Sequence, residues 1–174
     1  MPFARIHDPG TLASALQLRH RVFRERLGWL PASPEGLDLD RADLDAVHLG
    51  VLDADGRLVA YCRLLLRPDT WMLDTEFRAP AEHDLAAWAR RSKLSIAEVS
   101  RFCARDGPAA AELLWEGLGY ARRCGLHAVV GVTDEKFFQW LRQETASPTW
   151  SIAWPGDRAP GRLPFLLSLS GASQ

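Results

Sequence analysis

The chain has 174 residues and a formal net charge of −1, with 47% hydrophobic and 25% charged residues. These values are typical of a water-soluble domain with its own hydrophobic core, and the balanced charge argues against nucleic-acid binding. No apolar run is long enough to span a membrane, no secretory signal is visible, and the three scattered cysteines favour neither disulfides nor a zinc site. We therefore expect one cytoplasmic domain, residues 1–174, with no metal site.

The N-terminal third predicts a strand, a helix and a long acidic loop. Residues 3–6 favour a short strand, and apolar residues recur at helical spacing over 12–27, with Gly28 at the end of the helix. Residues 31–45 show little periodicity, and long loops of this kind are often functional. The loop lacks the glycine and glutamate spacing of a calcium-binding loop, so we expect it to face cationic partners with its four aspartates, Asp38, Asp40, Asp43 and Asp45.

The rest of the chain alternates strands and helices. A hairpin is followed by a strand–helix–strand crossover, which implies a parallel pair inside a largely antiparallel sheet. This order predicts an α+β domain like that of GNAT acyltransferases: a mixed, mostly antiparallel sheet with splayed central parallel strands, flanked by helices. The expected elements are strands at 47–52 and 57–66, an ambiguous segment at 72–77, a helix at 82–91, a strand at 97–102, a helix from 108 to Gly125, a strand at 127–133, a helix from Asp134 to 143, and strands at 150–154 and 163–169.

The predicted strand at 97–102 carries two charges, on Glu98 and Arg101. Removing a charge from water costs several kcal/mol unless the charge is paired, so each of the two side chains needs a partner. That partner is either an opposite charge in a structural ion pair or a substrate. The segment after this strand, 103–108, lacks the glycine-rich pyrophosphate loop of acetyl-CoA enzymes, so an ordinary acetyl-CoA enzyme is not expected.

The chain contains a series of motifs in a fixed order: 18–23 with 26–29, the acidic loop 38–43, the hairpin 56–65 with Arg63, Met72-Leu73 with Phe77, Glu98-Val99-Ser100-Arg101-Phe102, and Gly131-Val132-Thr133. Together these motifs resemble those of the acyl-homoserine-lactone synthase (autoinducer synthase) family. Asp38 replaces the usual glutamate of the family, Ala42 stands where an aromatic residue is usual, and the C-terminus is shorter than in most members.

The resemblance implies a reaction between S-adenosylmethionine and an acyl thioester carried on acyl carrier protein or coenzyme A. The methionyl amine attacks the thioester, and the methionyl carboxylate then displaces methylthioadenosine and closes a lactone, which is a quorum-sensing signal. Both molecules are substrates, so no separate cofactor is expected. The chemistry needs no enzyme nucleophile, which agrees with a sequence in which no Ser/His or Cys/His arrangement is evident.

The same resemblance assigns the site residues. Glu98 is the expected general base for the amine, and Phe23 and Trp29 can pack on the adenine or the sulfonium. The arginines are expected to hold the acidic loop and to meet the substrate carboxylate. The expected catalytic residues are Glu98, Ser100 and Arg101; the residues for S-adenosylmethionine are Arg19, Phe23, Trp29, Asp40, Asp43, Arg63 and Arg101; and those of the acyl pocket are Val99, Phe102, Leu114, Gly131, Thr133 and Phe137.

Gly131 and Phe137 suggest the kind of acyl chain. In the family that the chain resembles, members that favour a 3-oxo chain tend to carry a threonine at the position of Gly131, and a flexible methionine is frequent at that of Phe137. Gly131 has no hydroxyl with which to bond a 3-oxo group, and Phe137 supplies a rigid ring, so the resemblance implies a chain without a 3-oxo group that is short, branched or aromatic. Alternatively, the rings pack an ordinary core and the acyl tail runs elsewhere.

The sequence alone leaves two other functions possible and does not decide which surface binds a carrier protein. The chain is alternatively an N-acyl amino acid synthase that makes no lactone, or a non-catalytic protein that binds acyl carrier protein. An acidic carrier protein needs a basic surface, and the exposed cations that form it are alternatively ordinary solvated side chains. The candidates are Arg90, Arg91 and Lys93 in one cluster and Arg122 and Arg123 in another.

Overall fold

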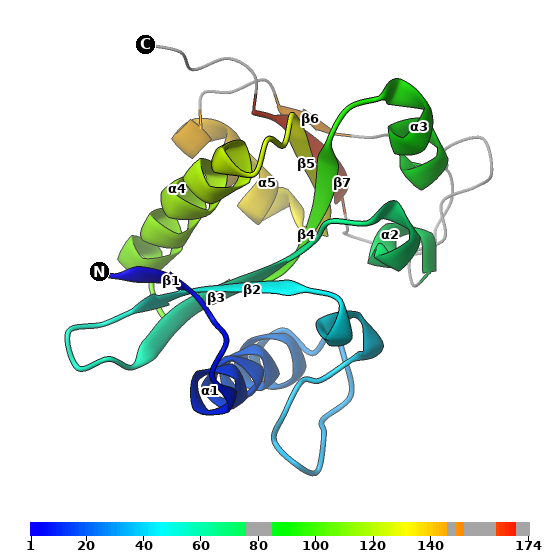
Figure 1. The fold of residues 1–174 in the computed structure, drawn as a ribbon. Helices are drawn as coiled ribbons and strands as arrows, with labels where there is room; N and C mark the ends of the chain where they lie inside the picture. Colours follow the sequence, from blue (N-terminus) through cyan, green and yellow to red (C-terminus); the bar gives the residue numbers. More distant parts are fainter. Residues whose placement is uncertain (76–84, 146–148, 152–162, 170–174) are drawn as a thin grey trace. The chain divides into compact units, whose positions relative to one another are not determined.

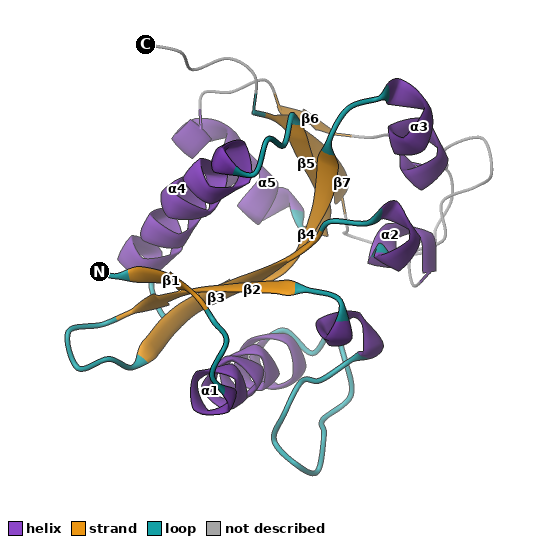
Figure 2. Cartoon of the chain, in the orientation of Figure 1, coloured by secondary structure: helices purple, strands orange, loops and turns teal. Residues whose placement is uncertain are grey.

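A computed structural model describes residues 1–75, 85–145, 149–151 and 163–169 (Figure 1). Strands and helices are mixed along the chain (Figure 2), and the predicted α+β class is confirmed. The contacts divide the chain into two compact units. Unit 1 contains residues 1–64 and 101–119, and unit 2 contains residues 65–100 and 120–174. The expectation of one domain over 1–174 stays a prediction.

Unit 1 is built on antiparallel strands. Ala4 pairs with Gly50, and Leu49 pairs with Cys62, so the predicted hairpin is confirmed. In Figure 1, α1 lies on one side of these strands and the first part of α4 on the other. The elements of this unit are β1 (Phe3–Arg5), α1 (Pro9–Arg19), a π-helical segment (His20–Arg26), a 3₁₀ turn (Arg41–Leu44), β2 (Val47–Leu52), β3 (Leu58–Leu65), the second half of β4 (Ile96–Ala104) and most of α4 (Gly107–Arg123).

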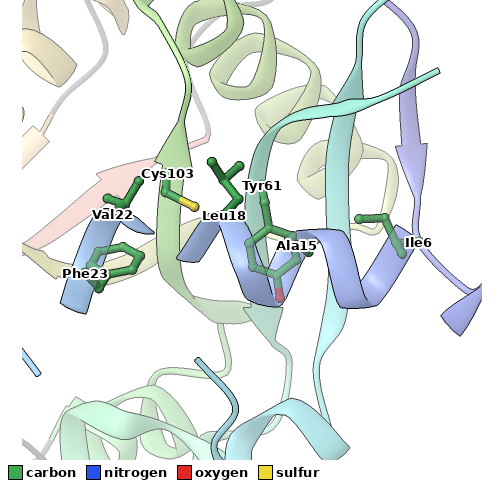
Figure 3. Close-up of a cluster of buried hydrophobic side chains, with 7 residues drawn as sticks. All are labelled: Ile6, Ala15, Leu18, Val22, Phe23, Tyr61 and Cys103. Carbon is green, nitrogen blue, oxygen red and sulfur yellow. The ribbon is translucent and has the colours of Figure 1, made fainter. Parts of the chain in front are cut away.

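Helix α1 covers the strands of unit 1 with an apolar face. It begins at Pro9 because Asp8 caps it: the Thr11 N–H donates to Asp8 Oδ1 at 2.7 Å. The buried side chains of the helix and of the π-helical segment then meet residues of β3 and β4 (Figure 3). This cluster fixes the helix on the sheet, and its members are Ile6, Ala15, Leu18, Val22, Phe23, Tyr61 and Cys103.

The sequence predicted a single α-helix up to Leu27, but the last turns are π-helical, over His20–Arg26. The Leu27 N–H donates to the Val22 carbonyl at 3.0 Å, which is the i→i+5 bond of a π-helix. Gly28, with φ of +62°, ends the segment, and the Trp29 N–H closes the turn onto the Phe23 carbonyl. The predicted end of the helix is therefore confirmed, while the geometry of its last turns differs.

Unit 2 contains the parallel pair. Strand β4 pairs with β5 from Ile96↔Ala128 to Glu98↔Val130, and β5 then pairs antiparallel with β7. The parallel ladder covers only three residue pairs, as splayed strands require. Besides the first half of β4, the unit contains α2 (Met72–Thr75), α3 (Leu85–Ser92), the end of α4, β5 (Ala128–Thr133), α5 (Glu135–Thr145), β6 (Thr149–Ser151) and β7 (Leu163–Ser168), with the strands in the order β4-β5-β7-β6.

Some predicted features fall outside the described residues. These are Phe77 of the Met-Leu…Phe motif, the start of the helix expected at 82–91, and residues 152–154 of the strand expected at 150–154. The ambiguous segment at 72–77 is helical in its described part, α2. Among the described helices, none is both long enough and apolar enough to cross a membrane.

Gly131, in the middle of β5, is required by packing. A Cβ atom at this position would come within 2.7 Å of the Val99 carbonyl oxygen and 2.9 Å of the Phe165 ring. Distances this short do not occur between real atoms of these types, so a side chain here would displace β4 or the ring. The absence of a side chain at Gly131 therefore has a structural cause inside unit 2.

We expect Gly131→Ala to lower the free energy of unfolding by about 1–3 kcal/mol, because the methyl group overpacks the β4–β5–β7 contact. Gly117→Ala is the matched control. Gly117 is a helical residue of α4 whose Cβ would meet nothing within 4 Å, so this substitution should stabilise the protein by about 0.5–1 kcal/mol. Urea unfolding of the purified variants measures both effects. Equal stability of Gly131→Ala and the wild type would contradict the packing at β5.

Candidate functional site

An ion-pair network in unit 1 holds the acidic loop. Its carboxylates come from Asp38, Asp40 and Asp43, and its guanidinium groups come from four different elements. Arg19 lies at the end of α1, Arg24 on the π-helical segment, Arg63 on β3 and Arg101 on β4. The sequence predicted that Arg19, Arg63 and Arg101 hold this loop, and the geometry of unit 1 brings all three onto it.

The loop folds onto α1 through its backbone and its side chains together. The Asp38 N–H donates to the Leu16 carbonyl at 3.1 Å, and Arg19 Nε donates to Asp38 Oδ2 at 3.0 Å. The side chain of Asp38 is completely buried, as is that of Arg19. Two buried charges are stable only when the remaining hydrogen-bonding positions are also filled, and further arginines fill them.

Asp40 and Asp43 shape the 3₁₀ turn as well as binding arginines. The Ala42 N–H donates to Asp40 Oδ1 and the Asp40 N–H donates to Asp43 Oδ2, each at 2.9 Å, which is a capping box. Arg63 then binds both side chains: Nη1 lies 2.7 Å from Asp40 Oδ1 and 2.5 Å from Asp43 Oδ1. The turn is thus held by its own hydrogen bonds and by Arg63 of β3. Of the two carboxylates, Asp40 is the more exposed, at 17% of its side chain against 4% for Asp43.

Arg101 is held in an unusual backbone conformation. Its φ is +55°, in the left-handed region that a residue other than glycine rarely adopts. Arg101 Nη2 donates to Asp40 Oδ2 at 2.9 Å, and Nε lies 3.0 Å from Asp38 Oδ2 at an angle that makes an ion pair but no hydrogen bond. The guanidinium also lies over the Phe23 ring, 5.6 Å from its centroid. Because the left-handed residue interrupts the strand, side-chain alternation along β4 does not continue through Arg101.

The network contains four guanidinium groups for three carboxylates. Burial alone would raise the pKa of Asp40, but the hydrogen bond and the charge of Arg63, together with the charges of Arg101 and Arg19, lower it to about 2. Asp40 is therefore ionised at neutral pH. The described network as a whole has one positive charge in excess.

His48 and Tyr61 support the network from the strands. His48 Nδ1 lies 2.7 Å from the Tyr61 hydroxyl, and Nε2 lies 3.1 Å from the Asp43 carbonyl oxygen. A carbonyl can only accept, so Nε2 carries the hydrogen and Nδ1 accepts from Tyr61. Burial lowers the pKa of His48 and raises that of Tyr61, which keeps both side chains neutral at physiological pH. The Arg19 guanidinium lies over the Tyr61 ring at 5.7 Å.

The aromatic residues expected near S-adenosylmethionine also lie in unit 1. The Phe23 and Trp29 ring centroids are 5.7 Å apart. Phe23 is buried, and Trp29 is partly exposed. All seven residues expected to bind S-adenosylmethionine are therefore in unit 1, and five of them belong to the ion-pair network.

Two of the three expected catalytic residues lie in unit 2. Glu98 on β4 is 2% exposed, and its Oε2 accepts a hydrogen bond from the Leu73 N–H at 3.1 Å. Ser100 lies two residues further along the same strand and is partly exposed. Both charges predicted to need a partner on this strand have one: Glu98 the α2 backbone and Arg101 the aspartates.

The residues expected to form the acyl pocket divide between the units. Phe102 and buried Leu114 belong to unit 1, and the other four belong to unit 2. In unit 2 the Phe137 ring packs against Trp140, with centroids 5.0 Å apart. This agrees with the alternative that the rings pack among themselves, and the acyl pocket stays a prediction.

Sequence reasoning missed one member of the network. Arg24 was assigned no role from the sequence, but it binds Asp38 Oδ1 through Nε at 2.9 Å and Nη2 at 2.8 Å. Asp38 was expected to face cationic partners with the other aspartates of the loop, and it contacts Arg19, Arg24 and Arg101. Arg24 carried no signal without the π-helical geometry.

We expect acid to weaken the network only at low pH. The pKa of Asp40 lies below the ordinary value of 3.8, so its stabilising effect is complete above about pH 4 and is lost as the pH falls toward 2. The free-energy difference between wild type and Asp40→Asn should therefore be constant from pH 7 to about pH 4 and shrink by about 2 kcal/mol below it. Urea unfolding at a series of pH values measures this difference. Asp45→Asn, in the exposed part of the same loop, is the control, and a matching trend for it would contradict the assignment.

Comparisons with known proteins show the family of the chain. Residues 18–115 match the family described as acetyltransferase (GNAT) domain. The acyl-homoserine-lactone synthase of Pseudomonas chlororaphis is 31% identical over 135 residues, and the match covers 72% of this chain and 64% of that protein. The chain thus spans about two thirds of the length of this relative.

Solved structures show the same fold. A crystal structure of TofI in a ternary complex with an inhibitor and MTA has a TM-score of 0.74 at 24% identity, covering 97% of this chain and 92% of TofI. BjaI, a CoA-dependent acyl-homoserine lactone synthase solved with SAM and isopentyl-CoA, has a TM-score of 0.73 at 22% identity, covering 92% and 76% of the two chains. With a match over more than half of its length, the chain belongs to the acetyltransferase (GNAT) domain family, and within that family it is similar to acyl-homoserine-lactone synthases.

Proposed function

We propose that the protein is an acyl-homoserine-lactone synthase. In this reaction the amine of S-adenosylmethionine is acylated from a thioester, and the methionyl carboxylate closes the lactone with loss of methylthioadenosine. The observation that carries the proposal is the locked acidic loop of unit 1, in which the motif residues Arg19, Asp40, Asp43, Arg63 and Arg101 form one network. The similarity to the Pseudomonas chlororaphis enzyme supports it.

The network suits a ligand that carries both signs of charge. S-adenosylmethionine has a sulfonium, an amine and a carboxylate. Arg101 uses Nε and Nη2 toward Asp38 and Asp40, and within the described residues no contact occupies Nη1. The excess positive charge therefore fits the ligand carboxylate at the Nη1 edge of Arg101. Asp40, ionised and partly exposed, is suited to the amine or the sulfonium.

Glu98 is proposed as the base that takes the proton of the amine. It is a buried carboxylate on the same strand as Arg101, three residues away in sequence. General bases need to be within hydrogen-bonding reach of the proton, directly or through one water. Its hydrogen bond from the Leu73 N–H fixes one carboxylate oxygen and leaves the carboxylate in a defined orientation.

The acyl donor is proposed to be carried by acyl carrier protein or coenzyme A. An acidic carrier protein would bind exposed cations, and Arg90, Arg91 and Lys93 are exposed at the end of α3, as is Arg123 at the end of α4. Arg122 is partly buried and donates to the Leu169 carbonyl at 3.3 Å. The α3 cluster is therefore the better candidate surface.

Mass spectrometry of the products tests the function. Purified protein is incubated with S-adenosylmethionine and a panel of acyl thioesters on both carriers. We expect an N-acyl-homoserine lactone and an equal amount of methylthioadenosine. An acylated amino acid without lactone would instead identify an N-acyl amino acid synthase, and binding of the carrier protein without any product would identify a non-catalytic protein.

We expect Glu98→Gln to lower kcat by about 10²–10⁴-fold, because glutamine keeps the shape and the acceptor for Leu73 but has no basicity. Steady-state assays, with circular dichroism as the check on folding, measure the effect. Ser92→Ala, on the neighbouring helix α3, serves as a control that should leave kcat unchanged. A kcat equal to that of the wild type in the glutamine variant would remove Glu98 from the mechanism.

We expect the enzyme to prefer an acyl chain without a 3-oxo group. Gly131 offers no hydroxyl to a 3-oxo carbonyl, and a buried carbonyl without a partner costs about 1–3 kcal/mol, so discrimination should be ten-fold or more. The packing around Gly131 also leaves no space for a substituted residue to supply that bond. Competition between matched acyl donors of four to twelve carbons, with and without the 3-oxo group, measures the preference. A higher kcat/KM for a long 3-oxo donor would show that Gly131 does not select the chain.

A further inference from the structure

We propose that Arg24 is a positioning residue for the ligand carboxylate. It holds Asp38, and Asp38 in turn holds Arg101, the side chain to which the proposed function assigns the methionyl carboxylate. The inference rests on that proposed function. Arg24 makes no recorded contact with Arg101 within the described residues, so its effect is transmitted through Asp38.

The π-helical segment is what brings Arg24 to Asp38. Arg19 and Arg24 are five positions apart in the sequence. In an α-helix, with 3.6 residues per turn, side chains five apart point in clearly different directions. In a segment with i→i+5 hydrogen bonds, residues five apart come close to the same side. Arg19 and Arg24 accordingly reach the same carboxylate, at 3.0 Å and 2.9 Å.

The two oxygens of Asp38 have separate partners. Oδ1 is bound by Arg24, through Nε at 2.9 Å and Nη2 at 2.8 Å. Oδ2 faces Arg19 Nε and Arg101 Nε, each at 3.0 Å. Arg24 and Arg19 therefore fix the rotation of the carboxylate about its Cβ–Cγ bond from its two oxygens, and loss of Arg24 would leave Oδ1 without either of these contacts and Oδ2 held by Arg19 and Arg101 alone.

Arg101 depends on this fixed carboxylate. Its left-handed φ of +55° is an unfavourable conformation that surrounding contacts have to maintain. Those contacts are Asp38, Asp40 and the Phe23 ring. Because the contact of Nε with Asp38 is an ion pair without hydrogen-bond geometry, Asp38 acts on the guanidinium through the position of its charge, beside the directed hydrogen bond from Nη2 to Asp40.

The charge of Arg24 also explains why Arg101 can bind an anion. Three carboxylates would be neutralised by Arg19, Arg63 and Arg101 alone. With Arg24 present, a guanidinium of the π-helical segment also compensates the charge of Asp38, and the network then has one positive charge in excess. Arg101 is the member with an unoccupied Nη1 edge, so the excess charge is available to a ligand there.

Two ligands distinguish a role of Arg24 in positioning Arg101 from a general role in the stability of the protein. S-adenosylhomocysteine has the amino-acid carboxylate, whereas methylthioadenosine has the same nucleoside and no carboxylate. Isothermal titration calorimetry of both ligands is carried out on wild type, Arg24→Gln, Arg24→Lys and the control Arg21→Gln, an exposed arginine of the same segment. Trp29 is held by its own backbone bond to Phe23, so the nucleoside contact is expected to survive in all four proteins.

We expect Arg24→Gln to raise the Kd for S-adenosylhomocysteine about ten-fold and to change the Kd for methylthioadenosine less than two-fold. Arg24→Lys keeps the charge but loses the two-nitrogen contact, so it should raise the Kd for S-adenosylhomocysteine about three-fold. Arg21→Gln should leave the Kd of both ligands unchanged.

Three results would overturn the inference. An equal loss of affinity for both ligands in the Arg24 variants would assign Arg24 a purely structural role. Unchanged affinity for S-adenosylhomocysteine in both variants, with urea midpoints showing intact folding, would show that Arg24 does not position Arg101. A wild-type protein that binds neither ligand would contradict the proposed function itself, and this result is distinct from the other two.

Discussion

The rest of unit 1 depends on keeping buried carboxylates charged. Asp38 is fully buried and Asp43 nearly so, and leaving such groups unpaired costs several kcal/mol each. Arginines from a helix, a π-helical segment and two strands supply the compensating charge. The acidic loop, about fifteen residues long, is thereby held in one conformation, because Asp38, Asp40 and Asp43 are each bound from more than one element.

Strand β4 contributes a charged side chain to each of the two units. Its first half carries Glu98, a carboxylate held by the backbone of α2, and its second half begins with Arg101, held by the acidic loop. The left-handed residue at the junction ends the regular alternation of the strand. Arg101 thus lies on a strand but binds the acidic loop. Ion pairs with the aspartates of the loop maintain its strained backbone conformation.

The sequence predicted the regular parts of the fold well, since their periodicity is local. The hairpin and the stop at Gly28 depend on neighbouring residues and are confirmed. The pairing of Arg19, Arg63 and Arg101 with the loop followed from motif resemblance. Arg24 could not be predicted, because helical periodicity assumes 3.6 residues per turn. The packing reason for Gly131 was equally out of reach, because it depends on Phe165, a residue 34 positions away on another strand.

In the π-helical segment, the number of residues is itself a structural constraint. Between Arg19 and the glycine that ends the helix, the number of residues decides which side chains face the loop, so an insertion or deletion of one residue here would exchange Arg24 for a neighbour even if every charge were kept. Related chains should then vary more freely in the exposed residues of this segment than in its length. Alignment gaps within 19–28 would therefore mark a change in how the loop is held, whatever the conservation of the motifs on either side.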